Sequence, residues 1–561
     1  MDLSNTSSAG SAGIMGQPAV ALFKRARFLA VAGLMVALLF ALACSAQQAA
    51  APAGEQSPAG GQPKYGGILK LHWVGGAPSD LDVLTGCASI CSARISPVYS
   101  QLVRYDPPKS AEEAVIMPDL AERWDYSADG KTLTFHLQKN AKWDDGVPVT
   151  SADVKYTFDR WLDPKDPLAS KFSGTREALA DIDSVEAVDN NTVRFYLKLP
   201  SNGLLPYLAQ GSRFIVPKHA WPTMDPAKDM NGSGPFRLKS YQPGVSIEYE
   251  KNPNYFVKDK PYLDGVIDYF LKDNATRVAA FTTGQIDMLR FIDQPMWDQI
   301  HKDDPQAVLV PWNALRATLL QTNMARKPFE DPRVRKAIFM ALDRQEGSKI
   351  IAGDWGAIGG YITAGPWALP AAELKTMPGY GDPKAQAAEA KQLLAQAGYP
   401  DGFKAELLLS ANNTLYETTA VWVKDQLKKN LNIDVTLNVR QPAQYSTAFR
   451  AGDFDLWVHT SPASYPDPTG HPSTITWGPG NVVSFNDKEI LDLTQQQDET
   501  LDTTKRKELV NQMERLLLQR GPYTVITWIK LGTALHPWVK NHFEPIGWYS
   551  GNQYDHIWLA K

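Results

Sequence analysis

The chain has 561 residues, a length that at about 150 residues per domain allows three or four domains. Hydrophobic residues make up 43% and charged residues 21%, with 40 Gly and 40 Pro, which excludes a collagen-like, fibrous or disordered protein. Lys and Arg total 57 against 61 Asp and Glu, and a net charge of -4 lacks the basic character that nucleic-acid binding requires. We therefore expect a globular multidomain protein with no nucleic-acid partner.

The N-terminus has the pattern of a secretory signal peptide. Lys24, Arg25 and Arg27 precede an apolar run from Phe28 to Ala43. The run is shorter than the roughly 20 residues that span a bilayer, and we expect a soluble chain beyond it. Residues 1–43 are the expected signal peptide, and either Met1 or Met15 is its start.

The residues around Cys44 resemble a bacterial lipobox, although Ala41 stands where that pattern usually has Leu. The resemblance implies that Cys44 becomes the first residue of the mature chain and carries lipid; simple cleavage of the signal is the alternative. Residues 44–64 are rich in Gln, Ala, Pro and Gly and form the expected flexible tether. These features predict an extracytoplasmic protein, lipid-anchored to the outer face of the cytoplasmic membrane or periplasmic.

Cys87 and Cys91 are the remaining cysteines. Outside the cytoplasm such a pair favours a local disulfide. A metal site is the alternative, but His72 alone would leave its set of ligands incomplete. We therefore expect no metal and no cofactor.

The first predicted strand begins at Ile68 and ends before a loop at residues 75–78. Apolar and polar residues then alternate at 132–137 and again at 193–197, after the turn residues Asp129-Gly130 and Asp189-Asn190-Asn191, which indicates hairpins. Between them, Thr150 begins a predicted helix. Residues 106–212 are therefore an expected α+β segment.

Helices and strands alternate in the later half of the chain. Asp331-Pro332 begins one predicted helix, and Asp382-Pro383 begins another that ends at Gly398. Further elements are expected as strands at 405–409 and 433–439 and a helix at 421–431. This alternation predicts an α/β lobe.

Short catalytic motifs are missing. The sequence has no G-x-S-x-G nucleophile elbow, no phosphate-binding G-x4-GK[ST] loop and no H-E-x-x-H zinc pair. Asp144 and Asp145 could serve as acid and base, but adjacent Asp residues are more typical of a turn. We expect no enzyme; a secreted hydrolase whose carboxylates come from distant residues is the alternative from another class.

Long blocks of the sequence resemble family 5 of the extracytoplasmic solute-binding proteins, the peptide, dipeptide and nickel receptors of ABC importers. The main block is MPDLAERWDYSADGKTLTFHLQKNAKWDDGVPVTSADVKYTFDR at 117–160. The others are GSGPFRLKSYQPGVSIEYEKNPNYF at 232–256, KPFEDPRVRKAIFMALDR at 327–344, AAEAKQLLAQAGYPDGF at 387–403 and ASYPDPTG at 463–470.

The resemblance implies an α/β fold of the periplasmic-binding-protein type, with two α/β lobes joined by hinge strands and an extra α+β domain inserted in lobe I. It assigns residues 65–105, 213–311 and 530–561 to lobe I, 106–212 to the inserted domain and 312–529 to lobe II. The implied function is a monomeric receptor that closes around a small solute, peptide-like by family, and delivers it to a membrane permease driven by an ATPase. A receptor for an oligosaccharide or metal chelate is the alternative within the fold. A module that closes on solute but signals to another partner is a further alternative.

The resemblance also implies which segments hold the solute. The expected residues are Trp73, Ala77, Ser233, Gly234, Trp457, Ser464, Tyr465, Asp467, Trp477 and Trp528. For each aromatic residue, packing in the core is the alternative role. Peptide-binding members have an Asp where Ser464 stands, to pair with the ligand's ammonium group, and Asp467 could replace it. Stacking on Trp457, Trp477, Trp528 and Trp548 would suit a sugar instead.

Overall fold

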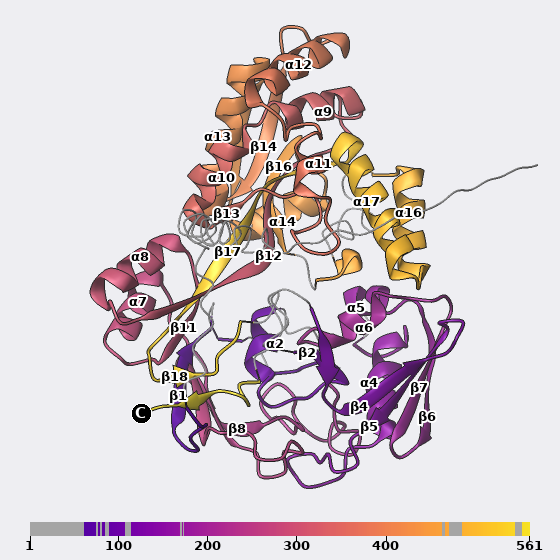
Figure 1. Ribbon diagram of the computed structural model, residues 1–561, viewed down its shortest axis with the longest axis vertical. Coiled ribbons are helices and arrows are strands. Elements are labelled where there is room, and N and C mark those ends of the chain that lie inside the picture. Colours follow the sequence, from indigo (N-terminus) through magenta and orange to yellow (C-terminus); the bar gives the residue numbers. More distant parts are fainter. Residues whose placement is uncertain are drawn as a thin grey trace, which may run out of the picture. The chain divides into compact units, whose positions relative to one another are not determined.

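A computed structural model describes residues 61–73, 77–78, 81–84, 89–106, 114–168, 171, 173–462, 466–470, 485–544 and 553–561. These residues belong to a single unit of the chain, Gln56–Lys561. Figure 1 shows the two lobes and the inserted domain.

An 11-stranded sheet runs through both lobes in the order β15-β14-β16-β12-β17-β11-β1-β10-β9-β8, with β13 beside β17. Its strands are β1 (Ile68–His72), β8 (Phe236–Gln242), β9 (Ser246–Lys251), β10 (Gly265–Tyr269), β11 (Met288–Ile292), β12 (Val308–Thr322), β13 (Gly356–Ala357), β14 (Lys404–Ser410), β15 (Asp434–Arg440), β16 (Leu456–Pro462) and β17 (Tyr523–Leu535).

The long antiparallel strands β12 and β17 connect the two lobes. Their pairing starts at Val308 opposite Leu535 and reaches Gln321 opposite Tyr523. In the first lobe β17 also pairs with β11, and in the second lobe β12 also pairs with β16. The register shifts between Asn313 and Arg316, which marks a β-bulge where the strands cross from one lobe to the other. This confirms the expected hinge strands.

The first lobe contains β1 and β8 to β11, and the strand predicted from Ile68 is confirmed as β1. Its helices are α2 (Ser89–Ile95), α7 (Asn274–Thr282) and α8 (Gln294–Asp303), and its short strands include β2 (Val103–Tyr105), β18 (Val539–Lys540) and β19 (Trp558–Leu559). Strand β2 pairs with β3 (Ile116–Pro118), which lies within the range expected for the inserted domain.

The inserted domain is built on a four-stranded antiparallel sheet in the order β4-β5-β7-β6. Its strands are β4 (Ala121–Tyr126), β5 (Thr132–Leu137), β6 (Ile182–Asp189) and β7 (Thr192–Leu197), and its helices are α4 (Ser151–Leu162), α5 (Ser173–Ala178) and α6 (Leu204–Ala209). The predicted alternating strands and the helix after Thr150 are confirmed. The backbone N–H of Thr150 donates to the Asp153 carboxylate at 2.8 Å, which stabilises the start of α4.

The second lobe carries ten helical elements among its described residues. They are α9 (Pro332–Met340), α10 (Arg344–Ala352), η1 (Gly353–Trp355), α11 (Ala371–Leu374), α12 (Pro383–Gln396), α13 (Thr414–Leu431), α14 (Pro442–Arg450), η2 (Pro468–Gly470), α16 (Lys488–Glu499) and α17 (Thr503–Arg520). Of these, α9, α12 and α13 correspond to the three helices predicted in the later half. Asp331 and Asp382 each accept a backbone N–H of the helix that follows, and a proline occupies the first turn.

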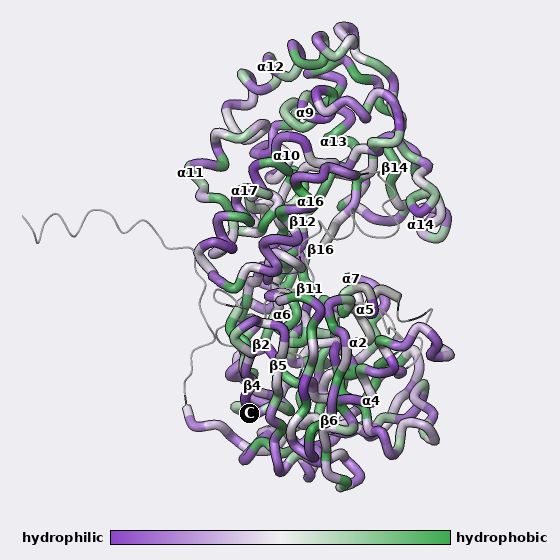
Figure 2. The backbone as a smooth tube through the Cα atoms, turned by 90° about the vertical axis from the view of Figure 1, so that its right-hand side faces the viewer, coloured by the Kyte–Doolittle hydropathy of each residue, from purple (hydrophilic) through white to green (hydrophobic). Residues whose placement is uncertain are grey.

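The hydrophobic cores follow the two lobes rather than three separate domains. One core cluster contains first-lobe residues such as Leu69 and Val266 together with Phe135 and Phe195 of the inserted domain. Two further clusters belong to the second lobe. Figure 2 shows the hydropathy along the same backbone. Within the described part of the chain, no helix combines the length and apolar character needed to cross a membrane.

Candidate ligand-binding site

Trp73 lies at the end of β1 and is 1% exposed. Its backbone N–H donates to Asp268 at 3.1 Å, and the same carboxylate accepts from Nε of Arg94 at 2.7 Å. The ring packs edge-on against Phe291 with centroids 4.6 Å apart. The Nε1–H of Trp73 is buried and has no hydrogen-bond partner among the described residues.

Two other predicted features lie near the same strand. Ala77 is exposed, and the carbonyl of Pro78 beside it accepts from the Tyr241 hydroxyl at 3.0 Å. His72 is buried, with Nδ1 2.6 Å from the carbonyl oxygen of Tyr269, and burial lowers its pKa to about 4. In the part of the chain that the structure describes, no three His, Cys, Asp or Glu are grouped as a metal site.

Ser233 and Gly234 lie where two backbone segments meet. The N–H of Gly234 donates to the carbonyl of Val98 at 2.8 Å, and a Cβ on Gly234 would lie 2.7 Å from Val98 backbone atoms. Glycine is therefore required for this close approach. The Ser233 hydroxyl is buried and has no hydrogen-bond partner among the described residues.

Trp457, on β16, is packed into the second lobe. Its ring stacks on His459 at 3.5 Å and on Phe449 at 4.0 Å, and its Nε1–H donates to the Tyr445 hydroxyl at 2.6 Å. Burial lowers the pKa of His459 to about 3, so this stack is uncharged at neutral pH. These contacts are those of a core residue.

Trp528, on β17, is 6% exposed. Its Nε1–H donates to the carbonyl of Gly360 at 3.0 Å, and Gly359 lies against the ring so closely that a Cβ there would be 2.7 Å from Cδ1. Trp528 therefore fixes the loop around residue 360 to a strand that joins the lobes.

Asp467 forms a buried ion pair. Its two carboxylate oxygens accept from Nη2 and Nη1 of Arg506 at 2.7 and 2.8 Å, and the side chains of Asp467 and Arg506 are 8% and 5% exposed. The N–H and hydroxyl of Thr469 also donate to Asp467. With both oxygens engaged, this arrangement favours a structural role for Asp467 over pairing with a ligand ammonium group.

A polar cluster that was not among the expected residues lies at the bulge of β12. Arg316 donates through Nη2 to the Thr460 hydroxyl at 3.0 Å, and Tyr416 lies 3.2 Å from the same hydroxyl. Burial lowers the pKa of Arg316. An arginine within an apolar run was the signal, since buried Arg on a strand is rare in the absence of a function or a partner.

Several predicted residues fall outside the described part of the chain. They are Cys44, Cys87, Ser464, Tyr465, Trp477 and Trp548, and of Cys91 only the backbone, in α2, is described.

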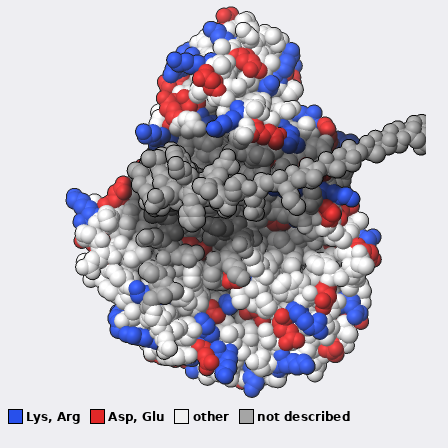
Figure 3. Space-filling model, viewed as in Figure 1, with Lys and Arg blue, Asp and Glu red and all other residues white. Residues whose placement is uncertain are grey.

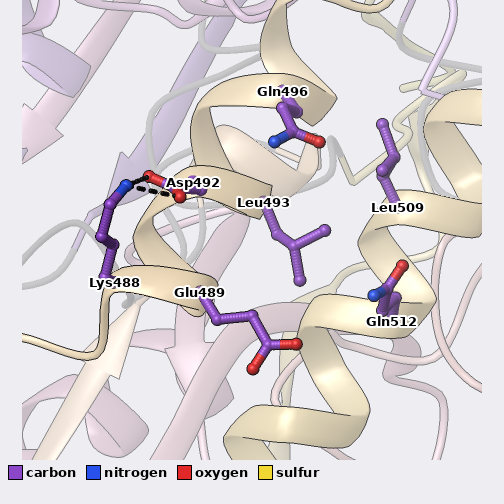
Figure 4. A pocket seen from close by; sticks show the side chains of 7 residues that line it. All are labelled: Lys488, Glu489, Asp492, Leu493, Gln496, Leu509 and Gln512. Atoms are coloured by element: carbon purple, nitrogen blue, oxygen red, sulfur yellow. Dashed lines mark hydrogen bonds and ion pairs between the residues drawn. The ribbon is translucent and has the colours of Figure 1, made fainter.

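Two surface pockets lie away from the predicted residues. One of about 530 Å³ lies between α16 and α17 (Figure 4), and one of about 610 Å³ lies beside α4 and β6 of the inserted domain. On the visible face, positive and negative side chains are interspersed (Figure 3). This mixture agrees with the small net charge.

Comparisons with known proteins agree with this architecture. Residues 115–481 match the model of the bacterial extracellular solute-binding proteins, family 5. A probable deoxycholate-binding periplasmic protein of Escherichia coli is 29% identical, with 76% of this chain and 82% of that protein covered. A dipeptide-binding protein of Bacillus subtilis is 26% identical, with 89% and 93% covered.

The solved structures show the same fold. A periplasmic binding protein of Agrobacterium tumefaciens in complex with agropinic acid has a TM-score of 0.71 and 29% identity, covering 88% of this chain and 99% of that one. An oligopeptide-binding protein of B. subtilis in complex with a nonapeptide has a TM-score of 0.71 and 24% identity, covering 89% and 100%. The predicted fold class is thereby confirmed.

The family and these relatives are binding proteins that act outside the cytoplasm. The match over residues 115–481, together with the two lobes and their hinge strands, identifies this chain as a member of family 5 of the bacterial extracellular solute-binding proteins, the solute receptors of ABC importers.

Proposed function

We propose that this receptor binds a short peptide or a peptide-like solute between its lobes and has no catalytic activity. The observation that carries the proposal is the pair of strands β12 and β17, which form the connection between two lobes with separate cores. Relatives named for dipeptides and oligopeptides support the solute class.

A solute that contacts both lobes favours the closed arrangement, because only that arrangement makes all its contacts. In the first lobe the Trp73 indole N–H and the Ser233 hydroxyl have no partner among the described residues and are the polar groups proposed to contact the solute. In the second lobe the cluster of Arg316, Tyr416 and Thr460 lies on the hinge side of β16 and supplies a cation suited to a carboxylate. Closure would bury most of the solute, which is how a receptor retains it from dilute solution.

A carboxylate-rich or amphipathic solute is the second candidate. Of two relatives at 29% identity, one is named as probably deoxycholate-binding and the other was solved in complex with agropinic acid. Ser464 stands where peptide receptors carry an acidic residue, and Asp467 already pairs with Arg506. A sugar or a metal chelate is a weaker alternative, since Trp457 and Trp528 are engaged in packing.

Native mass spectrometry of the purified protein, followed by denaturation to release bound solute, tests the proposal. We expect a co-purified peptide, or thermal stabilisation by di- and tripeptides; a solute at 100 times its dissociation constant adds about 2.7 kcal/mol. Stabilisation by deoxycholate or an opine but by no peptide would overturn the peptide assignment. Turnover of any of these compounds would overturn the assignment as a receptor without catalysis.

The same proposal includes the partners and the anchor. It takes the boundaries 65–105, 213–311 and 530–561 for lobe I, 106–212 for the inserted domain and 312–529 for lobe II. It further assigns lipid to Cys44, a tether to residues 45–64, a disulfide to Cys87 and Cys91, a monomeric state, and delivery to a membrane permease with its ATPase. Intact-mass measurement of protein extracted from membranes tests the lipid, and counting of free thiols in the folded protein tests the disulfide.

A further inference from the structure

A short loop of the inserted domain is hydrogen-bonded to the end of helix α16 in the second lobe. The Asp498 carboxylate accepts from the Ser201 hydroxyl at 2.9 Å and from the Gly203 N–H at 2.8 Å. The backbone N–H of Asn202 donates to the Asp498 carbonyl at 3.0 Å, and its side-chain amide donates to the carbonyls of Asp498 and Thr500 at 2.6 and 2.9 Å. These three consecutive residues thus donate hydrogen bonds to the Asp498 carboxylate and to the backbone carbonyls of Asp498 and Thr500. Both carbonyls lie at the helix end, where backbone carbonyls lack intrahelical partners.

The same contact is closely packed. A Cβ on Gly203 would lie 2.4 Å from the Thr469 hydroxyl, so the loop backbone rests directly on η2 of the second lobe. In a neighbouring turn of the inserted domain, Gly130 has a φ of +69° and a Cβ there would lie 3.0 Å from Leu501. Two loops of the inserted domain therefore contact the second lobe, one at η2, which precedes α16, and one at Leu501, between α16 and α17.

Side-chain contacts continue from this loop to a predicted solute residue. Arg506 pairs with Asp467 and also donates through Nε to Gln497, the neighbour of Asp498. Thr469, which Gly203 touches, donates its hydroxyl to Asp467 at 2.7 Å. Asp467 is thus connected to the loop by two short chains of contacts.

The inserted domain shares its hydrophobic core with the first lobe, whereas it meets the second lobe here through hydrogen bonds. It therefore moves with the first lobe when the hinge strands bend. Contacts between the loop and α16 must then break as the lobes separate. Because they are mainly hydrogen bonds over a small area, they can break and re-form without unfolding either lobe.

We propose that Asp498 and the loop Ser201–Gly203 form a latch that fastens the inserted domain to the second lobe and holds the two lobes together. The inference rests on the proposed receptor function, in which the lobes separate to admit and release a solute. The latch adds a third connection to the two hinge strands, and it restricts the rotation that these strands allow.

The test compares Asp498→Ala and Asp498→Asn with Asp492→Ala in purified, solute-free protein. Asp492 lies on the same helix and pairs with Lys488 at 2.7 Å on an exposed face (Figure 4), so its replacement removes the same charge without touching the latch. Hydrogen exchange of the Gly203 amide and the radius of gyration from small-angle X-ray scattering are the two readouts, with thermal unfolding as the control for folding.

We expect about tenfold faster exchange at Gly203 and a larger radius of gyration for Asp498→Ala, a smaller change for Asp498→Asn, which keeps one acceptor oxygen, and no change for Asp492→Ala. Unchanged exchange in both Asp498 variants would overturn the proposal. Faster exchange with an unchanged radius of gyration would show that the contact only anchors the loop and does not hold the lobes together. That result would also overturn the proposal. Both readouts are made without solute, so a protein that binds no peptide refutes the proposed function and leaves this test intact.

Discussion

The ion pair of Asp467 and Arg506 allows the structural role of Asp467 to be separated from a role in solute recognition. The two side chains are 8% and 5% exposed and share two hydrogen bonds of 2.7 and 2.8 Å. Removing one partner of such a buried pair costs roughly 3–5 kcal/mol, because a buried charge is left uncompensated, whereas removing both together costs much less.

We therefore expect Asp467→Asn and Arg506→Met each to lower the free energy of unfolding by about 3–5 kcal/mol. The double variant should lose clearly less than the sum, with a coupling energy of about 2 kcal/mol or more. Urea unfolding at pH 7 of solute-free protein, followed by Trp fluorescence, gives these values, provided the slope with urea stays unchanged. As a control, Asp492→Asn breaks an exposed pair and should cost less than about 0.5 kcal/mol.

Additive losses, or losses below about 1 kcal/mol for the single variants, would refute this reasoning. If Asp467→Asn left stability unchanged but abolished solute binding, Asp467 would be the ligand's partner after all. The pair of measurements therefore decides between the two roles that the sequence left open.

Three further changes test other parts of the structure. Burial raises the pKa of Glu514 to about 7, so the folded protein holds this proton at pH values where the unfolded chain has lost it. The free energy of unfolding of the wild type, relative to that of Glu514→Gln, should therefore decrease by on the order of 2–3 kcal/mol as the pH rises from 5 to 8. Burial alone would raise the pKa of Glu544, but Arg290 and His542 lower it to about 2. Glu544→Gln should therefore lower the free energy of unfolding by roughly 3–5 kcal/mol at pH 7. Urea titrations at several pH values should show this difference shrinking below about pH 4.5. A Cβ on Gly232 would lie 1.9 Å from a backbone oxygen, so Gly232→Ala should lower the melting temperature by several degrees, whereas Gly365→Ala, with space around its Cβ, should not.

Local structure was predictable where neighbouring residues determine it. The Asp-Pro pairs before α9 and α12 were sufficient because the Asp side chain and the fixed proline geometry act within one turn. The start of α13 was missed by seven residues: the helix begins at Thr414, where Asn413 accepts the N–H of Tyr416 at 3.2 Å, rather than at Val421.

The site was less predictable because its contacts join distant parts of the chain. Trp528 and Gly360 are 168 residues apart, and nothing local to either residue indicates their hydrogen bond. Trp457 shows the same limit for aromatic residues: its pattern suits a ligand platform and a core residue equally, and the stack with His459 favours the core. The position of Arg316 beside Thr460 likewise depends on pairing between strands and on a bulge that the sequence does not reveal.

The two crossing strands also make the second lobe a detachable module in evolution and in protein engineering. The chain leaves the first lobe at Asn313 and returns at Lys530, and these two residues are direct partners in the antiparallel ladder. A tight turn that joined Asn313 to Lys530 would replace the second lobe and leave the first-lobe parts of β12 and β17 as a hairpin. Both chain ends of the folded region, where Lys64 contacts the carbonyl of Ala560 at 3.2 Å, stay with the first lobe. One lobe could thus be exchanged between receptors at two cuts without moving either terminus.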